Sequence, residues 1–310
     1  MTRNQFDVLC FGSLTVDIFL HPSEMKIQED CMAFCVGDKI NLKQVHKFCG
    51  GGAANTSIGF SKLGLRSAAI GVIGSDAEGI FIRQELQKNN VEDRFVIQEE
   101  DESSGFSVIM MCEDGRRTVF HHKNSNPDLD KTLETSLCAK AIYIGHLAEE
   151  AESLLEQIPS WKEKCGGRVA WNPGKTQFQQ GFEKSKNIFP SIDVLILNKE
   201  EAILFTGEAV SEKAAQKFLI AGVQKVVITD GKKGADMWTG DQHFVATPEN
   251  IRPTSTLGAG DAFSVGVVSA ILHGQDEDVQ MSWGQKNAES VIQQFGAQNG
   301  QLDYNSISRR

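Results

Sequence analysis

Continuous apolar runs recur along the chain, separated by stretches in which apolar and polar positions follow a helical pattern. The runs cover residues 6–11, 68–73, 141–144, 168–171, 193–197 and 225–229. Because successive positions are apolar, rather than every second one, we expect strands that are buried on both faces. Strands of this kind that alternate with helices predict an α/β fold with a mostly parallel sheet covered on both sides.

The stretches between these runs carry helix start and stop signals. Asp76 is the expected N-cap of a helix at 77–89, and Gly64 ends the helix expected at 53–63. Further helices are expected at 149–164, 200–206, 212–221, 259–273 and 278–295. This order of strands and helices predicts a doubly wound architecture.

Two segments, about 31–48 and 94–121, depart from this alternation and have the pattern of short strands with polar turns. In the second segment, strands expected at 106–111 and 118–121 flank a turn at 113–115. We expect both segments to form a small antiparallel sheet that projects from the main domain. No internal repeat or Pro/Ser-rich linker divides the sequence, which predicts one domain over the whole chain.

Charge and hydropathy exclude several classes of partner. The 310 residues carry a net charge of −10, which offers no electrostatic footprint for nucleic-acid phosphates or an anionic membrane. No apolar stretch reaches the ~20 residues that span a bilayer. The first residues do not follow the pattern of a secretory signal, because Asp7, Gly12 and Asp17 interrupt the apolar positions. We therefore expect a soluble, cytoplasmic protein.

Seven cysteines are scattered along the chain without a Cys-x-x-Cys pair. Their odd number and irregular spacing fit reduced thiols in a cytosol, and not a disulfide framework or a zinc module. The neighbours His121 and His122, and the pair Cys31 and Cys35, have no further ligands at metal-binding spacing. We expect all four to be structural.

The strongest chemical signal is the sequence Gly258-Ala259-Gly260-Asp261 at the start of an expected helix. Its two glycines permit a tight turn whose N–H groups converge at the helix N-terminus, where an oxyanion binds. A carboxylate at this place can remove the proton from an attacking hydroxyl group. Taken alone, the motif is better explained as a glycine turn with a helix-capping Asp.

Together with other segments of the chain, the motif resembles the signature Asp-Thr-(Thr/Asn)-Gly-Ala-Gly-Asp of the ribokinase-like (PfkB) carbohydrate and nucleoside kinases. The resemblance extends from Phe6 to about Gly300, with the family's markers in the family's order. It implies a ribokinase-like fold, in which a doubly wound sheet carries an inserted β lid. It also implies an ATP-dependent kinase activity.

Two loops resemble the substrate side of this family. Gly12 to Asp17 follows the first strand, and a carboxylate just past the C-terminal end of a strand lies where open α/β sheets bind ligands. The alternative is a loop Asp that caps local backbone. Residues 50–55 (Gly-Gly-Gly-Ala-Ala-Asn) resemble the family's Gly-Gly-x-x-x-Asn, whose glycines let the backbone approach a polyol. The resemblance thus implies that Asp17, Gly51 and Asn55 bind the substrate.

Two later segments resemble the nucleotide side. Asn198 and Glu201 match the family's Asn-x-x-Glu, which orders water around Mg²⁺ and places Glu201 on the metal side. The alternative is a helix-capping box. Thr229, Gly231 and Gly234 match a Thr-x-Gly-x-x-Gly turn that approaches the nucleotide, and their alternative is a tight turn between two strands.

The C-terminal part both extends the resemblance and departs from it. In the family, the stretch corresponding to residues 296–300 wraps adenine and surrounds a monovalent cation, which implies a contact by Asn299. Ser255 stands where the family usually has Asp, and Leu257 where it has Thr or Asn. The missing Asp supports the cation loop in many members, so K⁺ activation is in question. The intact Gly258 to Asp261 segment keeps the phosphoryl-transfer chemistry.

On this resemblance, Asp261 deprotonates an exocyclic CH₂OH group of a sugar, which then attacks the γ-phosphorus of ATP. The N–H groups around Gly258, Ala259 and Gly260 hold the charge that accumulates, and Mg²⁺ neutralises the phosphates. The alternatives are a nucleoside kinase of the adenosine type and a non-catalytic binding protein, against which the intact Asp261 argues. Arg117 meets an anionic substrate group or, more simply, solvent. Edge strands of the lid invite a homodimer.

Overall fold

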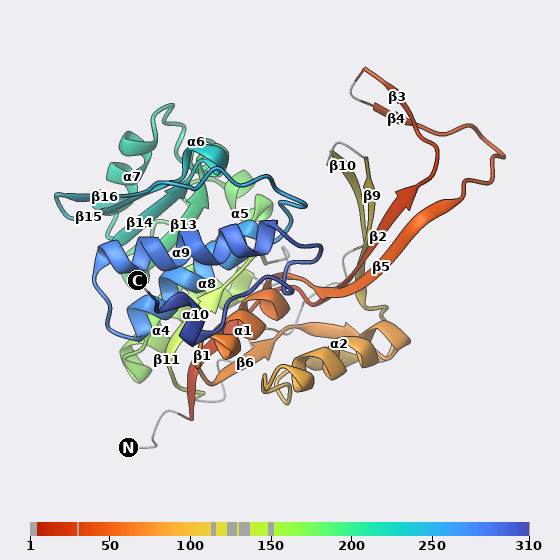
Figure 1. Cartoon of the computed structure of the whole chain (residues 1–310). Helices are drawn as coiled ribbons and strands as arrows, with labels where there is room; N and C mark the ends of the chain where they lie inside the picture. The colour runs from red at the N-terminus through yellow and green to blue at the C-terminus, as the bar shows by residue number, and fades with distance from the viewer. Residues whose placement is uncertain are drawn as a thin grey trace.

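The computed structural model describes residues 5–29, 31–112, 116–122, 129, 137–147 and 152–309. The turn expected at 113–115 and the first residues of the helix expected at 149–164 lie outside these ranges. Within the described residues the chain forms two regions, which we call the body and the lid (Figure 1).

The body is built on an eight-stranded sheet, counted over the described residues, with the order β16-β15-β14-β13-β12-β11-β1-β6. Six strands run parallel: β1 (Phe6–Phe11), β6 (Ser67–Ile70), β11 (Ala139–Ile144), β12 (Arg168–Trp171), β13 (Val194–Asn198) and β14 (Lys225–Thr229). Two antiparallel strands that the sequence did not predict, β15 (Ala235–Thr239) and β16 (Gln242–Ala246), extend one edge. The sheet is mostly parallel, as expected.

Helices cover both faces of the body sheet, because its strands are apolar on both sides. The helices are α1 (Gly52–Lys62), α2 (Ala77–Lys88), α4 (Glu152–Cys165), α5 (Lys175–Gln180), α6 (Lys199–Thr206), α7 (Ser211–Ile220), α8 (Ala259–Leu272), α9 (Glu277–Ile292) and α10 (Tyr304–Ile307). Leu9 and Phe11 of β1 point into a core with α4, α6 and α7. Val8 and Cys10 point to the other side, into a core with α1, α8 and α9. The doubly wound prediction is confirmed.

Four strands form the lid: β2 (Thr15–Pro22), β5 (Leu42–Gly50), β9 (Gly105–Met111) and β10 (Arg117–His122). Their order is β10-β9-β2-β5, and they extend away from the body in Figure 1. A small hairpin of β3 (Lys26–Gln28) and β4 (Cys31–Ala33) projects beyond them, and β7 (Val72–Gly74) pairs with β8 (Ile97–Glu99) near α2.

The composition of the lid corrects the expectation in two ways. Its central strand β2 comes from residues 15–22, before the segments predicted to form it. Because β2 pairs parallel with β9 and antiparallel with β5, the lid sheet is mixed and not purely antiparallel. The strand follows β1 after three residues, so its alternating pattern is easily mistaken for a loop past the first strand.

One cysteine pair contradicts the expectation of reduced thiols. Cys138, just before β11, and Cys165, at the end of α4, form a disulfide with their Cα atoms 5.4 Å apart. They are 27 residues apart in sequence, and the packing of α4 beside the sheet brings them together. In the part of the chain that the structure describes, no helix has the length and apolar character needed to cross a bilayer.

Candidate active site

Asp261 lies in the first turn of α8, just after the loop whose Leu257 packs against the lid. The helix begins after Gly258, whose φ of 79° is left-handed and whose Cβ, if present, would collide with Ala297. A Cβ added at Gly260 would meet open space, so the backbone there is accessible to a ligand. Because the first N–H groups of a helix have no partner within it, this turn presents donors to an anion. Binding of an anion at residues 258–260 stays a prediction, and in this structure the N–H of Ala259 donates to the carbonyl of Thr256 at 3.4 Å.

Asn55 of α1, the neighbouring helix of the body, holds the carboxylate of Asp261. Its Nδ2 donates to Asp261 Oδ2 at 2.9 Å, across 206 residues of sequence. Its Oδ1 accepts from Gln298 Nε2 at 3.0 Å, which fixes the orientation of the amide. Three segments that the sequence assigned separately, α1, α8 and the loop after α9, therefore meet at one carboxylate.

Asp17 approaches the same site from the lid. It lies in the middle of β2 and not in a loop after β1, which corrects the expected position. Its carboxylate is packed so closely on Gly50 that any Cβ at that position would collide with it. Burial raises the pKa of Asp17, hydrogen bonds from Ser107 and Thr15 act against this rise, and the negative charge of Asp261 adds to it. The two carboxylates are thus close enough for the charge of Asp261 to affect the pKa of Asp17.

The pKa of Asp261 is raised as well. Burial is the main cause, and the hydrogen bond from Asn55 and the charge of His146 act in the opposite direction. A raised pKa makes the carboxylate a stronger proton acceptor, which suits a general base. His146, which the sequence analysis missed, follows β11 at the sheet edge where ligands of open α/β sheets bind. Its position just after a predicted strand is the signal that could have identified it as a site residue.

The glycine stretch at 50–55 joins the end of β5 to the start of α1, and its predicted approach to a substrate stays a prediction. Gly51 has a φ of 89°, and a side chain there would collide with the carbonyl of Ser13. Ser13, which was missed, ties the loop after β1 to α1 because its Oγ accepts from the N–H of Gly52 at 3.1 Å. A Cβ at Gly52 would meet open space, which leaves room for a substrate beside Asn55.

Asn198 and Glu201 form the capping box that was the alternative for this pair. Asn198 Oδ1 accepts from the N–H of Glu201 at 2.8 Å, and Glu201 Oε2 accepts from the N–H of Asn198 at 2.9 Å. Burial raises the pKa of Glu201, whereas its hydrogen bonds with Asn198 and the charge of His146 lower it. Because His146 acts on both Glu201 and Asp261, the capping box lies at the same edge of the sheet as the catalytic candidate.

Thr229 lies directly opposite Asn198 in the register of β13 and β14. The following turn is tight, because the N–H of Asp230 donates to the carbonyl of Gly234 at 2.7 Å, and Gly231 and Gly234 both have positive φ. A Cβ at Gly234 would collide with the carbonyl of Ala246. A tight turn therefore joins β14 to β15 at the C-terminal edge of the sheet, as the alternative for this motif has it, and its contact with a nucleotide stays a prediction.

Asn299 is exposed and donates from Nδ2 to the carbonyl of Phe295 at 2.7 Å, so its side chain closes its own loop. Ser255 is buried, and its Oγ accepts from the N–H of Leu257 at 3.3 Å. It stabilises the loop by a local bond at the position where the resembling family usually has Asp. No cluster of three or more His, Cys, Asp or Glu side chains suited to a metal occurs among the described residues.

The family profile of the pfkB family carbohydrate kinases matches residues 5–303, which include every one of the site residues above. The chain belongs to this family. The ribokinase of Staphylococcus aureus is 25% identical over 303 residues, which are 94% of this chain and 95% of that relative. This pfkB kinase is thus a phosphotransferase that acts on an alcohol group of a carbohydrate or nucleoside.

Solved structures show the same fold for this pfkB kinase. The ribokinase of Arabidopsis thaliana, complexed with ribose and ATP, has a TM-score of 0.79 at 21% identity and covers 97% of both chains. A nucleoside kinase of Burkholderia thailandensis, in complex with inosine, has a TM-score of 0.75 at 18% identity and covers 97% of this chain and 96% of that one. The expected ribokinase fold is confirmed.

Proposed function

We propose that the protein transfers the γ-phosphoryl group of ATP to an exocyclic hydroxymethyl group of a sugar, with Asp261 as general base. The observation that carries this proposal is the position of Asp261, which combines the first turn of α8, the bond from Asn55 and the facing carboxylate of Asp17. A base at the point where an anion binds makes chemical sense only if a hydroxyl group must lose its proton beside a phosphoryl group.

The residues divide the reaction between them. Asp17, Gly51 and Asn55 hold the sugar by its hydroxyls, and Asp261 accepts the proton of the attacking hydroxyl as its oxygen bonds to phosphorus. The N–H groups of residues 258–260 hold the charge on the phosphoryl oxygens while the bond to the leaving diphosphate breaks. Asn198, Thr229, Gly231, Gly234 and Asn299 are the nucleotide-side contacts in this proposal.

Mg²⁺ fits the donor set on the nucleotide side. Glu201 offers a half-buried carboxylate whose orientation is fixed by Asn198, and Mg²⁺ keeps several waters, so one carboxylate acting through water is enough. When bound, Mg²⁺ supplies charge neutralisation of the phosphates. Ser255, which bonds within its own loop, gives no carboxylate for a K⁺ site, so we propose activity without added K⁺.

The aromatic side chains under the lid favour a sugar over a nucleoside. Phe19 contacts Phe48 and Phe295 with ring centroids 5.6 and 6.2 Å apart, and His46 stacks on Phe295 at 5.5 Å. Rings packed on one another would have to separate before a nucleobase could stack between them. Rates of ATP consumption with a panel of sugars, sugar acids and nucleosides measure this preference directly.

The deciding experiment compares Asp261→Asn with Asp17→Asn. We expect Asp261→Asn to lower kcat at least ~10²-fold with little change in the KM for ATP, because a positioned base contributes typically 10²–10⁴-fold. Asp17→Asn is the matched control from the lid, and we expect it mainly to raise the KM for the sugar. Near-normal turnover of Asp261→Asn would rule out the assigned base.

We also propose a homodimer formed through the lid. Beside the lid's edge strands, its outer face exposes apolar side chains, among them Val45, Phe106 and Phe120, with exposed fractions of 56, 38 and 57%. They belong to three different strands and lie on the same face of the lid sheet. Sedimentation at micromolar concentration is expected to give twice the mass of the chain. A monomer mass would contradict the proposal.

A further inference from the structure

Three polar side chains on neighbouring strands of the lid form a hydrogen-bonded row that starts at Asp17. Ser107 of β9 lies opposite Asp17 of β2, and His121 of β10 lies opposite Ser107, in the register of the lid sheet. The hydroxyl of Ser107 bonds to the carboxylate of Asp17, and its Oγ is hydrogen-bonded to His121 Nδ1 at 3.0 Å. The row therefore leads from a buried carboxylate to an exposed imidazole on an edge strand of the lid.

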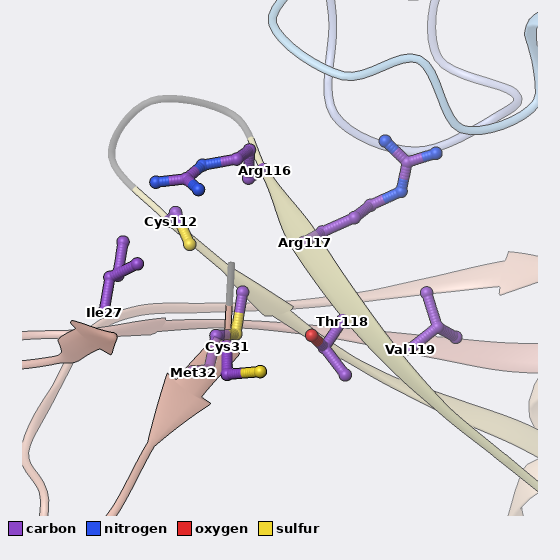
Figure 2. A pocket seen from close by; sticks show the side chains of 8 residues that line it. All are labelled: Ile27, Cys31, Met32, Cys112, Arg116, Arg117, Thr118 and Val119. Carbon is purple, nitrogen blue, oxygen red and sulfur yellow. The ribbon is translucent and has the colours of Figure 1, made fainter. Parts of the chain in front are cut away.

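The row lies on the face of the lid that packs against the body. Successive residues of a strand alternate between its faces, so His121 lies on the same side of β10 as Arg117 and Val119. Figure 2 shows this alternation, because Arg117 and Val119 extend to one side of β10 and Thr118 to the other. Arg117 donates from Nη1 to Thr256 Oγ1 in a loop of the body at 2.9 Å, which identifies this side as the one toward the body.

The adjacent histidine, His122, lies on the opposite face of β10. Its Nε2 is hydrogen-bonded to the Oγ of the exposed Ser103 at 2.9 Å, and its ring centroid is 5.3 Å from that of Phe106 on the outer face. Both histidines thus bond to a serine of the lid. The serine of His121 is the one that also bonds to Asp17.

The chemistry of the three groups sets the direction of both bonds. A hydroxyl has one proton to donate and an ionised carboxylate can only accept, so Ser107 donates to Asp17. Ser107 Oγ must then accept from His121, whose Nδ1 therefore carries the proton. In a hydrolytic triad the histidine lies between the serine and the acid and takes the proton of the serine. Here Ser107 lies between the other two, so it relays a hydrogen bond and is not activated as a nucleophile.

Asp17 needs such donors because it is buried. Burial raises its pKa, and the charge of Asp261 acts in the same direction, whereas the hydrogen bonds from Ser107 and Thr15 lower the pKa and favour the ionised carboxylate. Hydrogen bonds in a chain polarise one another, so the bond from His121 strengthens Ser107 as a donor. The imidazole thus acts on Asp17 through the hydroxyl between them.

Other charges near Asp17 lie on two elements. Asp261 of α8 faces it from the body. Val16 and Ile18, on the other face of β2, pack with α2, whose charged residues form ion pairs: Glu78 with Lys47, Arg83 with Asp93, and Glu85 with Lys88. Strand β9 contains no ionisable residue, and Arg117 is the charged residue of β10 on the face of His121. The donors on the lid that favour ionised Asp17 are therefore Ser107 and Thr15.

We propose that His121 is a positioning residue, which holds the Ser107 hydroxyl with its proton toward Asp17 and so keeps that carboxylate ionised and oriented for the hydroxyls of the sugar. This inference rests on the proposed function, in which Asp17 binds the sugar. An ionised carboxylate accepts hydrogen bonds from two sugar hydroxyls at once, whereas a protonated one loses part of this capacity. The relay therefore acts on the binding of the sugar and not on the transfer of the phosphoryl group.

The first test combines variants of His121 and Ser107, with the sugar of the panel that gives the highest rate of ATP consumption. We expect His121→Ala to raise the KM for this sugar ~3–10-fold, the range of one net hydrogen bond, with kcat changed less than twofold. Ser107→Ala removes the donor to the carboxylate itself, so we expect a rise of ~10–100-fold. Because His121 acts through Ser107, the double variant is expected to have the KM of Ser107→Ala. Multiplied effects in the double variant would overturn the proposal.

The second test is the pH profile of the KM for the same sugar. Without the relay we expect the pKa of Asp17 to rise further, so that, as the pH falls, the KM of His121→Ala begins to increase at a higher pH than that of the wild type. Protonation of His121 itself leaves the proton on Nδ1 and keeps the relay. The profile of Asp17→Asn, which cannot ionise at this position, is expected to lack this increase. An unshifted profile in His121→Ala would contradict the proposal.

Two replacements of His121 distinguish its two nitrogens. The amide N–H of Asn can take the place of Nδ1, whereas that of Gln reaches the place of Nε2. We expect His121→Asn to restore most of the wild-type KM, and His121→Gln to behave like His121→Ala. Restoration by Gln and not by Asn would show a direct contact through Nε2 and overturn the relay.

His122→Ala is the matched control, because it removes a serine-bonded histidine from the other face of the same strand. We expect it to keep the wild-type KM and pH profile. Thermal melts report whether each variant folds, and His121→Asn and His121→Gln carry the comparison if His121→Ala does not fold. A rise of KM in His122→Ala equal to that in His121→Ala would show a general loss of lid structure and contradict the proposal.

The failure of this inference differs from the failure of the proposed function. If Asp261→Asn loses turnover and His121→Ala leaves the KM for the sugar and its pH profile unchanged, only the role of His121 is wrong. If Asp261→Asn keeps turnover, the assigned base is wrong, whatever the variants of His121 do.

Discussion

The body and the lid use the same kind of strand for different purposes. Every residue of β1 in the body is buried, whereas β10 in the lid has one half-buried residue and otherwise exposed ones. The body sheet is covered by helices on both faces, while the lid sheet packs one face against loops of the body and directs the other away from it. This difference in burial indicates that the body contributes most of the stability of the molecule. The exposed side chains of the lid are available to contact ligands or other proteins.

Of the two neighbouring carboxylates, Asp261 belongs to the body and Asp17 to the lid. Asp261 stands on a helix of the body whose apolar side chains belong to one large core, and Asp17 stands on a strand of the lid, next to a small core. A base needs a fixed position relative to the anion-binding turn, whereas a group that holds the substrate benefits from closing with it.

The largest expected effect is on the free energy of unfolding, and it compares a large core of the body with the small core of the lid. Phe205 contacts the rings of Trp171, Phe178 and Phe218 in the body at centroid distances of 6.1, 5.5 and 5.6 Å. We expect Phe205→Ala to lower the free energy of unfolding in urea by about 3–5 kcal/mol, the range for deleting a buried Phe. Phe19→Ala, in the lid, is the control.

Phe19 is just as buried, but its cluster is small, so we expect a smaller loss of global stability and a larger rise of the sugar KM. Equal losses of unfolding free energy in Phe205→Ala and Phe19→Ala would show that body and lid unfold as one unit. That result would contradict the view that the stability comes mainly from the body.

A smaller effect concerns the pH dependence of stability. The raised pKa of Asp261 means that the folded state binds its proton more tightly than the unfolded state, whose Asp has the ordinary value of 3.8. Stability is therefore lost as the pH rises from the ordinary value through the raised one. We expect Asp261→Asn, which cannot ionise, to raise Tm by about 1–3 °C at pH 7 and not at pH 3.

Asp7, at the start of β1, is the control, because its pKa is shifted in the opposite direction to that of Asp261. Burial raises its pKa, but hydrogen bonds from Lys140 and Arg66 outweigh this effect, so its pKa is lowered. Its contribution to stability is present above the ordinary pKa and lost as the pH falls through the lowered one. Asp7→Asn is expected to lower Tm at pH 7. A fall of Tm at pH 7 in both Asn variants would contradict the assignment of Asp261 as a functional and not a structural carboxylate.

Much of the body could be predicted from local patterns. The N-cap bond of Asp76 to the N–H of Gly79 and the positive φ of Gly64 are where the sequence placed them. Capping and periodicity depend on neighbours within a turn or two of the chain, so they can be predicted without the tertiary structure. β15 and β16, with the sequences ADMWT and QHFVA, were missed because polar residues interrupt their apolar positions, and antiparallel pairing onto the sheet edge compensates for their weak signal.

The lid was predicted less well for a related reason. Successive side chains of its strands point alternately toward the body and away from it, so these strands are not continuous apolar runs. In addition, β2 could be mistaken for a loop because it follows β1 so closely. Its parallel register with β9 joins residues about 90 apart, so no local pattern could reveal that Asp17 and Ser107 are neighbours.

The sequence by itself determined the class of fold, the family and the identity of the carboxylate at the start of α8, because runs, caps and glycine turns depend on residues close together in the chain. Only the tertiary structure decided which distant groups surround that carboxylate. Asn55 meets Asp261 across 206 residues, Gln298 orients Asn55 across 243, and Arg117 reaches Thr256 across 139. Contacts of this kind exist only once the packing of sheet, helices and lid has set the distances between them, and that packing depends on the whole chain.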